Sequence, residues 1–149
     1  MATEFQSVTP YLCCSGAEKA LAFYIEAFDA KEVFRMTDPG DGRIGHLEFR
    51  IGEALLFLAD EYPDFGAVSP DTLGGTPVSL HLQVSDCDAV VARAEAAGAM
   101  VLRRPADQSF GERMAQIQDP WGHRWFIAQT VEQVSPEEMQ RRWEAETGI

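Results

Sequence analysis

Basic residues are scarce in this sequence: 12 Lys and Arg stand against 24 Asp and Glu, which gives a formal net charge of −12. A charge of this size repels phosphate backbones and anionic lipid surfaces. We therefore expect no nucleic-acid partner. Most of the acidic surface is expected to be solvated, although an acidic field can also attract a cationic ligand.

Long apolar runs are also lacking. No segment approaches the roughly 20 apolar residues that span a bilayer, and residues 1–6 have neither the basic nor the apolar part of a signal peptide. We expect no membrane association and a cytoplasmic protein. With 149 residues and 46% hydrophobic content, the chain can bury one good core, so we expect a single domain over residues 1–149.

Cysteine is sparse as well. The three cysteines, Cys13, Cys14 and Cys87, are an odd number and lack the spacing of a metal-binding knuckle. Neighbouring residues on a strand point to opposite faces, so a disulfide between Cys13 and Cys14 is not expected. We predict buried, reduced thiols, with a reactive thiol at Cys13 as the alternative.

The sequence does contain an internal repeat with an offset of about 70 residues. In the first copy, a strand-like stretch at 8–14 precedes the S-x-x-E spacing of a capping box at 15–18 and a segment with helical periodicity. In the second copy, a strand-like stretch at 78–84 precedes the same cap spacing at 85–88, with Ser85 first and Asp88 in the reciprocal place, and a helix that ends at Gly98. A strand followed by a helix is thus predicted twice.

Three extended segments follow each predicted helix, so each copy predicts a βαβββ module. The segments are 32–36, 45–51 and 54–58 in the first copy, and 100–103, 113–118 and 124–128 in the second. Module one is expected at about 7–60 and module two at about 77–130. Residues 61–76, rich in Pro and Gly, are expected to form a surface linker or lid.

A last helix is predicted at about 135–147, where Ser135 and Pro136 mark its start. Its apolar pair, Met139 and Trp143, is too short a stripe to stabilise an isolated helix. We expect the helix to pack on the domain or on a second subunit, with recruitment of a partner protein as a further alternative.

Several short motifs extend over the two modules: T-P-Y-L at 9–12, A-L-A-F-Y at 20–24, G-H-L-E-F-R-I-G at 45–52, S-L-H-L-Q-V at 79–84 and D-P-W-G-H-R-W at 119–125. On these motifs the chain resembles the glyoxalase / bleomycin-resistance / extradiol-dioxygenase (vicinal oxygen chelate) superfamily, and in particular its PhnB-like subgroup. The resemblance implies an α+β fold, in which two tandem βαβββ modules form a curved mixed sheet around a cavity that binds a small molecule. It also implies a homodimer.

In metal-dependent members, the resemblance implies four His, Gln or Glu ligands, one on the first and one on the last strand of each module. Alignment on Gly52 and Gly122 places these positions at Thr9, Leu56, Ser79 and Phe126. Leu56 and Phe126 have no donor atom, and neutral hydroxyls bind divalent metals poorly without carboxylate or imidazole help. We therefore expect no metal at the usual positions and predict no cofactor.

Strand alternation predicts which side chains face the cavity, because apolar residues at every second position pack on the helices. The predicted cavity-facing candidates are Thr9, Tyr11, Cys13, His46, Glu48, Arg50, Ser79, His81, Gln83, Met114, Gln116, Arg124 and Phe126. Arg113, next to a loop, is a candidate anion-binding residue, with a surface salt bridge as the alternative. His123 is expected to fix the turn after Gly122.

His46 and Glu48 form the sharpest pair, because H-x-E spacing on a strand places both side chains on one face, about 6 to 7 Å apart. Glu48 is a candidate general base, assisted by His46 or His81, in a lyase or isomerase that removes a proton next to a carbonyl. One alternative is a displaced divalent metal at His46, Glu48 and His81. Another is simple hydrogen bonding on an open sheet face.

A non-catalytic function is the competing hypothesis. Bleomycin-binding relatives sequester a drug without chemistry, and the absence of metal ligands together with the acidic charge fits a cationic aromatic compound. Tyr11 and Phe126 are candidates for stacking on a planar ligand.

Overall fold

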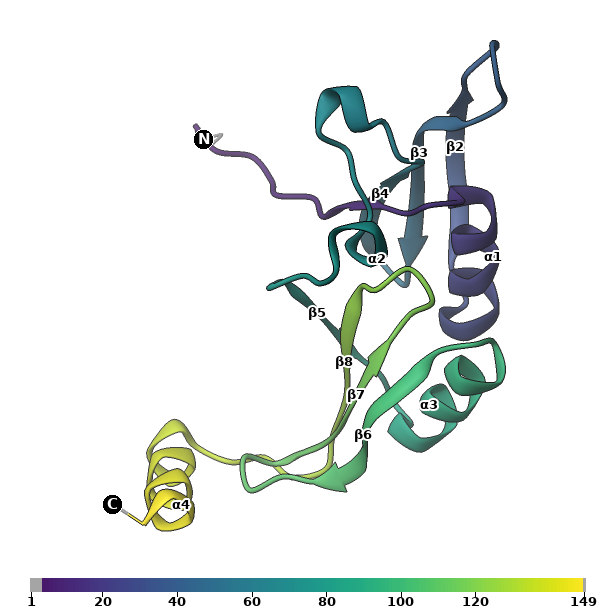
Figure 1. Ribbon diagram of the computed structural model, residues 1–149. Helices are drawn as coiled ribbons and strands as arrows, with labels where there is room; N and C mark the ends of the chain where they lie inside the picture. Colours follow the sequence, from purple (N-terminus) through teal and green to yellow (C-terminus); the bar gives the residue numbers. More distant parts are fainter. Residues whose placement is uncertain (1–3, 149) are drawn as a thin grey trace. The chain divides into compact units, whose positions relative to one another are not determined.

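A computed structural model describes residues 4–148. The chain divides into two compact units, Met1–Gly75 and Thr76–Ile149, and each unit contains one four-stranded mixed sheet (Figure 1). This confirms the α+β class and the two βαβββ modules. No helix in the described part of the chain has the length and apolar character to cross a membrane.

Module one runs in the predicted order. Its elements are β1 (Tyr11–Cys13), α1 (Ala17–Phe28), β2 (Lys31–Thr37), β3 (Ile44–Ile51) and β4 (Ala54–Ala59). The strand order is β1-β4-β3-β2, in which β1 is parallel to β4 and the other pairs are antiparallel. The parallel pair of β1 and β4 thus joins the first strand of the module to its last strand.

The core of module one lies between α1 and one face of the sheet. Leu47 and Phe49 of β3 are fully buried, and the Phe49 ring stacks on Tyr24 of α1 with centroids 5.5 Å apart and planes 3° apart. Burying side chains of this size on one face stabilises each by about 1.5 to 3 kcal/mol. Leu47 and Phe49 therefore face α1, and the side chains next to them in the strand face the opposite side of the sheet.

The start of α1 differs from the prediction. Ser15 and Glu18 do not form a capping box: the N-cap is Gly16, in a left-handed conformation with φ 100°, and the Ser15 hydroxyl donates to Asp71. Instead, Asp60 Oδ1 accepts from the amides of Gly16 (3.1 Å) and Ala17 (2.8 Å), while Oδ2 accepts from the Ile44 amide (2.7 Å). One carboxylate thus joins the ends of β4, β3 and α1.

The predicted linker has local structure of its own. It contains a short 3₁₀ helix, η1 (Pro63–Phe65), and one helical turn, α2 (Pro70–Leu73), and both begin with the proline that fits the first position of a helix. Ser69 before α2 is fully buried, and its amide donates to the Glu61 carboxylate.

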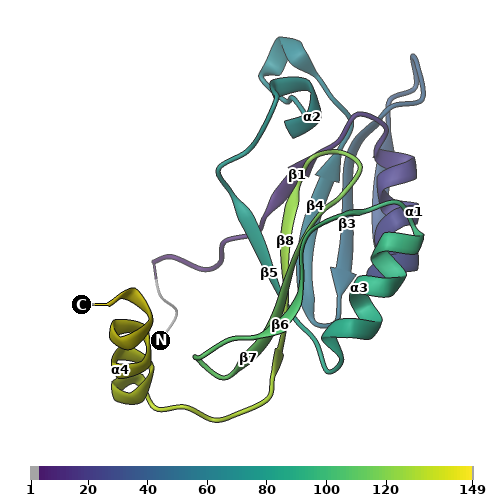
Figure 2. The ribbon, with the colours of Figure 1, turned by 60° about the horizontal axis from the view of Figure 1, so that its bottom comes forward.

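Module two repeats the plan. Its elements are β5 (Ser79–Gln83), α3 (Cys87–Ala96), β6 (Met100–Asp107), β7 (Glu112–Gln118) and β8 (Arg124–Thr130), with strand order β5-β8-β7-β6. Helix α3 packs along β6, β7 and β8 (Figure 2). The predicted cap with Ser85 at the N-cap and Asp88 in the reciprocal place is not formed: the N-cap is Asp86, one residue later, whose carboxylate accepts from the Ala89 amide.

The turn between β7 and β8 is organised by Asp119, whose side chain is 2% exposed. Its carboxylate accepts from the amides of Trp121 and His123 and from the indole N–H of Trp125, each at 3.0 Å. The backbone of His123 is thus part of the turn. The backbone of Asp119 closes the same turn, because its amide donates to the His123 carbonyl and its carbonyl accepts from the Gly122 amide.

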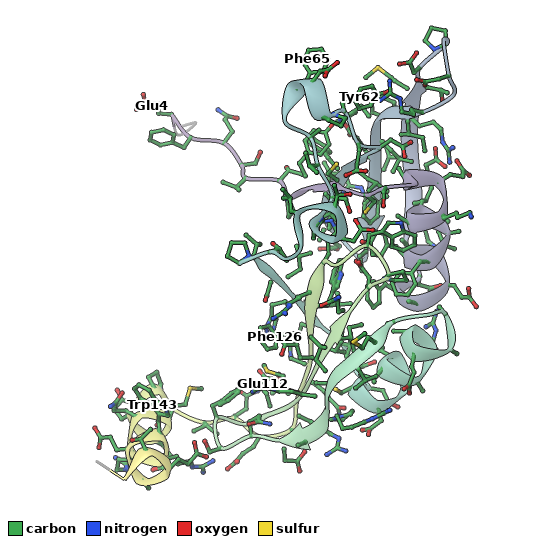
Figure 3. All side chains as sticks on the ribbon, in the orientation of Figure 1. Glu4, Tyr62, Phe65, Glu112, Phe126 and Trp143 are labelled. Carbon is green, nitrogen blue, oxygen red and sulfur yellow. The ribbon has the colours of Figure 1, made fainter. Side chains whose placement is uncertain are left out.

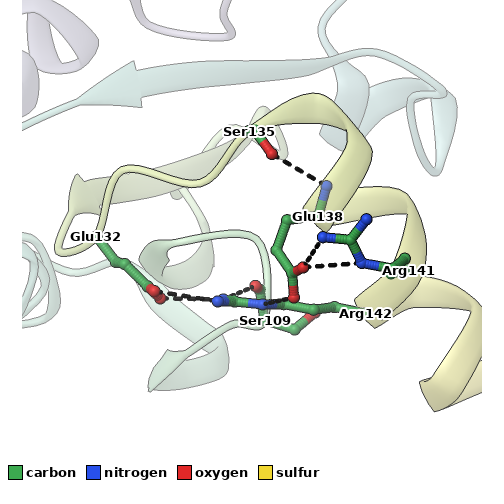
Figure 4. A network of polar contacts seen from close by, with 6 residues as sticks. All are labelled: Ser109, Glu132, Ser135, Glu138, Arg141 and Arg142. Atoms are coloured by element: carbon green, nitrogen blue, oxygen red, sulfur yellow. Dashed lines mark hydrogen bonds and ion pairs between the residues drawn. The ribbon is translucent and has the colours of Figure 1, made fainter.

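Helix α4 (Pro136–Thr147) begins where predicted, and the Ser135 hydroxyl accepts from the Glu138 amide. None of its residues is buried, and Trp143 is 61% exposed. Arg142 is its polar anchor: the guanidinium binds the Glu132 and Glu138 carboxylates and the Ser109 carbonyl (Figure 4). Polar contacts, rather than the Met139 and Trp143 pair, hold the helix to module two.

The Asp60 carboxylate gives a test of this packing. Replacement by Ala removes acceptors from three amides, and charge-assisted hydrogen bonds of this kind predict a loss of about 2 to 4 kcal/mol in the free energy of unfolding. Urea denaturation measures it. Asp64→Ala, at an exposed position of η1, is the matched control and should leave the midpoint unchanged. Equal midpoints for the two variants would contradict the role of Asp60.

Candidate functional site

The open face of the module-one sheet is the side that α1 does not cover. Tyr11 of β1, His46 and Glu48 of β3, and Phe57 of β4 lie there, while the apolar side chains that alternate with them are buried toward the helix: Leu12, Leu47, Phe49, Leu56 and Leu58. The pairing of strands aligns them, because Tyr11 is opposite Phe57 and Glu48 is opposite Phe57 on its other side. Strand alternation predicted this face correctly for Tyr11, His46 and Glu48.

Three of these side chains form a chain of hydrogen bonds. The Tyr11 hydroxyl lies 2.6 Å from His46 Nδ1, and His46 Nε2 lies 2.9 Å from Glu48 Oε2. As a carboxylate, Glu48 can only accept, so Nε2 carries the proton of the neutral ring and Nδ1 is an acceptor. The Tyr11 hydroxyl then donates to Nδ1. The order is hydroxyl, imidazole, carboxylate.

Aromatic rings enclose His46. Its ring centroid lies 4.8 Å from that of Phe57, 5.3 Å from Tyr11 and 5.9 Å from Phe34. The side chains of His46 and Glu48 are only 18% and 21% exposed. This packing restricts the imidazole to one orientation, the one in which both ring nitrogens are bonded.

The pKa of the Tyr11 hydroxyl is raised by its surroundings. Burial raises the pKa of Tyr11 above its ordinary 10.0, and the charges of Cys13 and Glu48 raise it further. Both effects disfavour a phenolate. The phenol is therefore the form present at neutral pH, as its role of donor to His46 requires.

A cavity of about 840 Å³ opens beside Tyr11, within module one and the segment that follows it. Its wall is mainly apolar and aromatic, and it is formed by Tyr11, Cys13, Met36, Thr37, Asp38, Pro39, Gly45, Ala59, Tyr62, Phe65, Gly66, Ala67 and Val68. Figure 3 shows Tyr62 and Phe65 on the segment after β4. Of the three hydrogen-bonded residues described above, Tyr11 is the one that lines this cavity.

Several lining residues were missed as site residues by sequence reasoning. Tyr62 and Phe65 belong to the predicted linker, and Asp38 to the predicted turn after β2. In the structure, the Tyr62 hydroxyl donates to Asp38 at 3.4 Å, and the Arg43 guanidinium lies 3.9 Å from the centre of the Tyr62 ring. The sequence feature that could have indicated them is the presence of two aromatic residues in a stretch otherwise rich in Pro and Gly.

The open face of module two carries a different polar set. His81 Nε2 lies 3.0 Å from Gln83 Oε1, and the Gln83 amide nitrogen donates to Glu112 and Thr130. Alternation also places Ser79, Met114, Gln116, Arg124 and Phe126 on this face, and the register pairs Ser79 with Arg124, His81 with Phe126 and Gln116 with Phe126. Within module two, His81 is thus bonded to a neutral amide.

Two candidate arginines make polar contacts away from Tyr11, His46 and Glu48. Arg113 lies on the helix-covered side of β7, where its guanidinium binds Asp88 at 2.7 Å and Asp107 at 3.1 Å. The salt-bridge alternative describes it, and we leave it out of the candidate site. Arg50 does not pair with Glu48: its guanidinium donates to the Glu53 carbonyl at 3.0 Å.

The position assigned to Leu56 needs a correction. Leu56 is 5% exposed and lies on the helix-covered face, so the open-face residue of β4 is its neighbour Phe57. The pairings agree, because Tyr11 is opposite Phe57 in module one and His81 is opposite Phe126 in module two. Phenylalanine provides no donor atom in either module, so these side chains do not fit the four-ligand metal site that the family resemblance implies.

Grouped metal ligands are not found elsewhere among residues 4–148: no three His, Cys, Asp or Glu side chains come together as a metal ion requires. Within the same residues, Cys13, Cys14 and Cys87 form no disulfide, as predicted. Thr9 is partly exposed just before β1, and Ser79 is exposed at the start of β5.

Comparison with known proteins agrees with this architecture. The family model described as Glyoxalase/Bleomycin resistance protein/Dioxygenase superfamily matches residues 5–127. The uncharacterized protein Mb0911c of Mycobacterium bovis is 39% identical over 137 residues, which cover 90% of this chain and 90% of the relative. The uncharacterized protein Rv0887c of Mycobacterium tuberculosis shows the same identity over 137 residues, which cover 90% of this chain and 80% of the relative.

Solved structures share the fold. A gene product of Arabidopsis thaliana has a TM-score of 0.68 at 24% identity, covering 83% of this chain and 98% of that one. A PhnB protein from Bacillus cereus has a TM-score of 0.66 at 20% identity, covering 84% and 100%. The fosfomycin resistance protein FosX from Listeria monocytogenes, solved with manganese(II) and sulfate, has a TM-score of 0.66 at 17% identity, covering 93% and 99%.

Cys13, which also lines the cavity, gives a test of its surroundings. Burial raises the pKa of the Cys13 thiol from 9.0 to about 11, and the carboxylates of Glu61, Asp60 and Asp71 add to the shift. A raised pKa lowers the thiolate fraction at a given pH, so at pH 8 alkylation by iodoacetamide should be about 100-fold slower than for an ordinary thiol. Mass spectrometry of folded and urea-unfolded protein measures this ratio. Equal rates would contradict the raised pKa, and a faster rate in the folded protein would show that Cys13 is a reactive thiol.

Proposed function

Because the chain belongs to the Glyoxalase/Bleomycin resistance protein/Dioxygenase superfamily, we propose that it binds a small organic molecule in the cavity of module one. The observation that carries the proposal is the cavity itself, about 840 Å³ in volume, with Tyr11 among the residues of its wall. Ligand sites have volumes of about 300 to 1,000 Å³ and mostly apolar walls with a few placed polar groups.

The lining predicts the chemistry of the ligand. Tyr11, Tyr62 and Phe65 offer aromatic surface to a planar or apolar body, and Asp38 is the lining residue with a charge. With a net charge of −12 on the chain, a neutral or cationic ligand is favoured over an anion. A carbonyl or hydroxyl group on the ligand can form a hydrogen bond with the Tyr11 hydroxyl.

Binding as proposed here involves no metal, because the residues at the family's ligand positions provide no suitable donor set. A non-catalytic sequestering protein and an enzyme both use such a cavity. A cytoplasmic location and the homodimer that the family resemblance implies belong to the same proposal, and family membership supports the dimer.

A thermal-shift screen with neutral and cationic aromatic compounds tests the proposal. A ligand at 100 times its dissociation constant stabilises by about 2.7 kcal/mol, which raises the melting temperature by several degrees. Gly45→Leu should weaken or abolish the shift, because the added side chain occupies part of the cavity next to Tyr62. A Cβ at Gly45 meets its nearest neighbours, the Tyr62 hydroxyl and the Met36 carbonyl, at 3.6 and 3.8 Å, so the backbone tolerates it.

Ala22→Leu, which adds bulk at an exposed position of α1, is the matched control and should keep the full shift. Tyr11→Phe should keep the shape of the cavity and weaken binding by about tenfold, since it removes one hydrogen bond. A compound that stabilises the wild-type protein and Gly45→Leu equally would place its binding elsewhere. A screen without any shift would contradict the proposal.

A further inference from the structure

We infer that Tyr11, His46 and Glu48 form a proton relay, through which the Tyr11 hydroxyl acts as general base toward a ligand in the module-one cavity. The inference rests on the proposed binding function and adds a reaction to it. It changes the role first expected of Glu48, because Tyr11 lines the cavity and Glu48 stands behind His46.

The geometry fits the transfer of a proton along the three groups. Distances of 2.6 Å from Tyr11 to His46 and 2.9 Å from His46 to Glu48 are those of well-formed hydrogen bonds. Nucleophilic and basic hydroxyls are activated by an adjacent base that a third group orients. Here His46 is the adjacent base and Glu48 the orienting carboxylate.

The surroundings stabilise a positive charge on His46 but not a negative charge on Tyr11. When His46 gains a proton on Nδ1, the imidazolium lies beside the Glu48 carboxylate, whose oxygen is 2.9 Å from Nε2. The carboxylate attracts this cation. A separate phenolate on Tyr11 is disfavoured, because its pKa is raised by burial and by the charge of Glu48. The proton of Tyr11 must therefore leave as the ligand proton arrives.

The step is balanced without an oxidant or a cofactor. A C–H bond next to a carbonyl of the ligand breaks, and its electron pair stays on the ligand as an enolate. The proton passes to the Tyr11 oxygen while the original hydroxyl proton passes to His46 Nδ1. Return of a proton to a different carbon, or to the other face of the same carbon, gives an isomer or an epimer. The substrate class is thus a small carbonyl compound with an acidic neighbouring C–H.

Module two provides an internal contrast. His81 is hydrogen-bonded to Gln83, whose amide is neutral and cannot stabilise an imidazolium as a carboxylate does. No tyrosine occupies β5, β7 or β8. The relay is a property of module one, although the two modules repeat the same fold.

Acetylation of tyrosine by N-acetylimidazole tests the relay on the ligand-free protein. A hydroxyl that can pass its proton to His46 attacks the reagent faster, so at neutral pH Tyr11 should acetylate at least tenfold faster than Tyr62, followed by peptide mass spectrometry. His46→Gln should remove the difference, because its side-chain oxygen can still accept a hydrogen bond but cannot take the proton. Glu48→Gln should lower the Tyr11 rate in part.

His81→Gln is the matched control and should leave the rate at Tyr11 unchanged. Tyr62, whose hydroxyl donates to Asp38, is the internal reference. An unchanged acetylation rate at Tyr62 shows that a variant has altered neither the reagent nor the fold. An equal Tyr11 rate in wild-type protein and His46→Gln overturns the relay. Because no ligand is present, that result would leave the binding proposal standing, and a failed thermal-shift screen would leave the acetylation result standing.

Discussion

The two-residue period of β3 is the constraint on which the candidate site depends. Leu47 and Phe49 are fully buried toward α1, so His46 and Glu48 have to lie together on the opposite face. A shift of register by one residue would bury an imidazole and a carboxylate without partners and expose two large apolar side chains. The stability of the core and the geometry of the site are therefore set by the same strand, and neither can change alone.

Much of the fold follows from local sequence patterns. The repeat, the helix periodicity and the cap at Ser135 are short-range features, and the structure contains them where predicted, whereas the cap of α3 lies at Asp86, one residue after the predicted Ser85. The start of α1 was not predictable in this way, because its cap is Asp60, 43 residues from Ala17 along the chain. A carboxylate that reaches three amides from the end of β4 leaves no local pattern, and the S-x-x-E spacing at Ser15 was misleading.

The correction at Leu56 has a similar cause. The turn between β3 and β4 consists of residues 52–53, whereas residues 119–123 connect β7 and β8. The two turns differ by an odd number of residues, so alignment on Gly52 and Gly122 shifts the last strand by one and exchanges its faces. The sequence predicted the pair His46 and Glu48 from its spacing. It did not join Tyr11 to them, because the two strands that bring Tyr11 and His46 together are 35 residues apart.

The most direct measurement of the central claim is the tautomer of His46, read from the nitrogen chemical shifts of its ring in ¹⁵N-labelled protein at neutral pH. The hydroxyl, imidazole and carboxylate order predicts a proton on Nε2 and an acceptor at Nδ1, with a change at Nδ1 alone in Tyr11→Phe. A proton on Nδ1 would reverse the direction of both hydrogen bonds, and it would contradict the role assigned to all three residues.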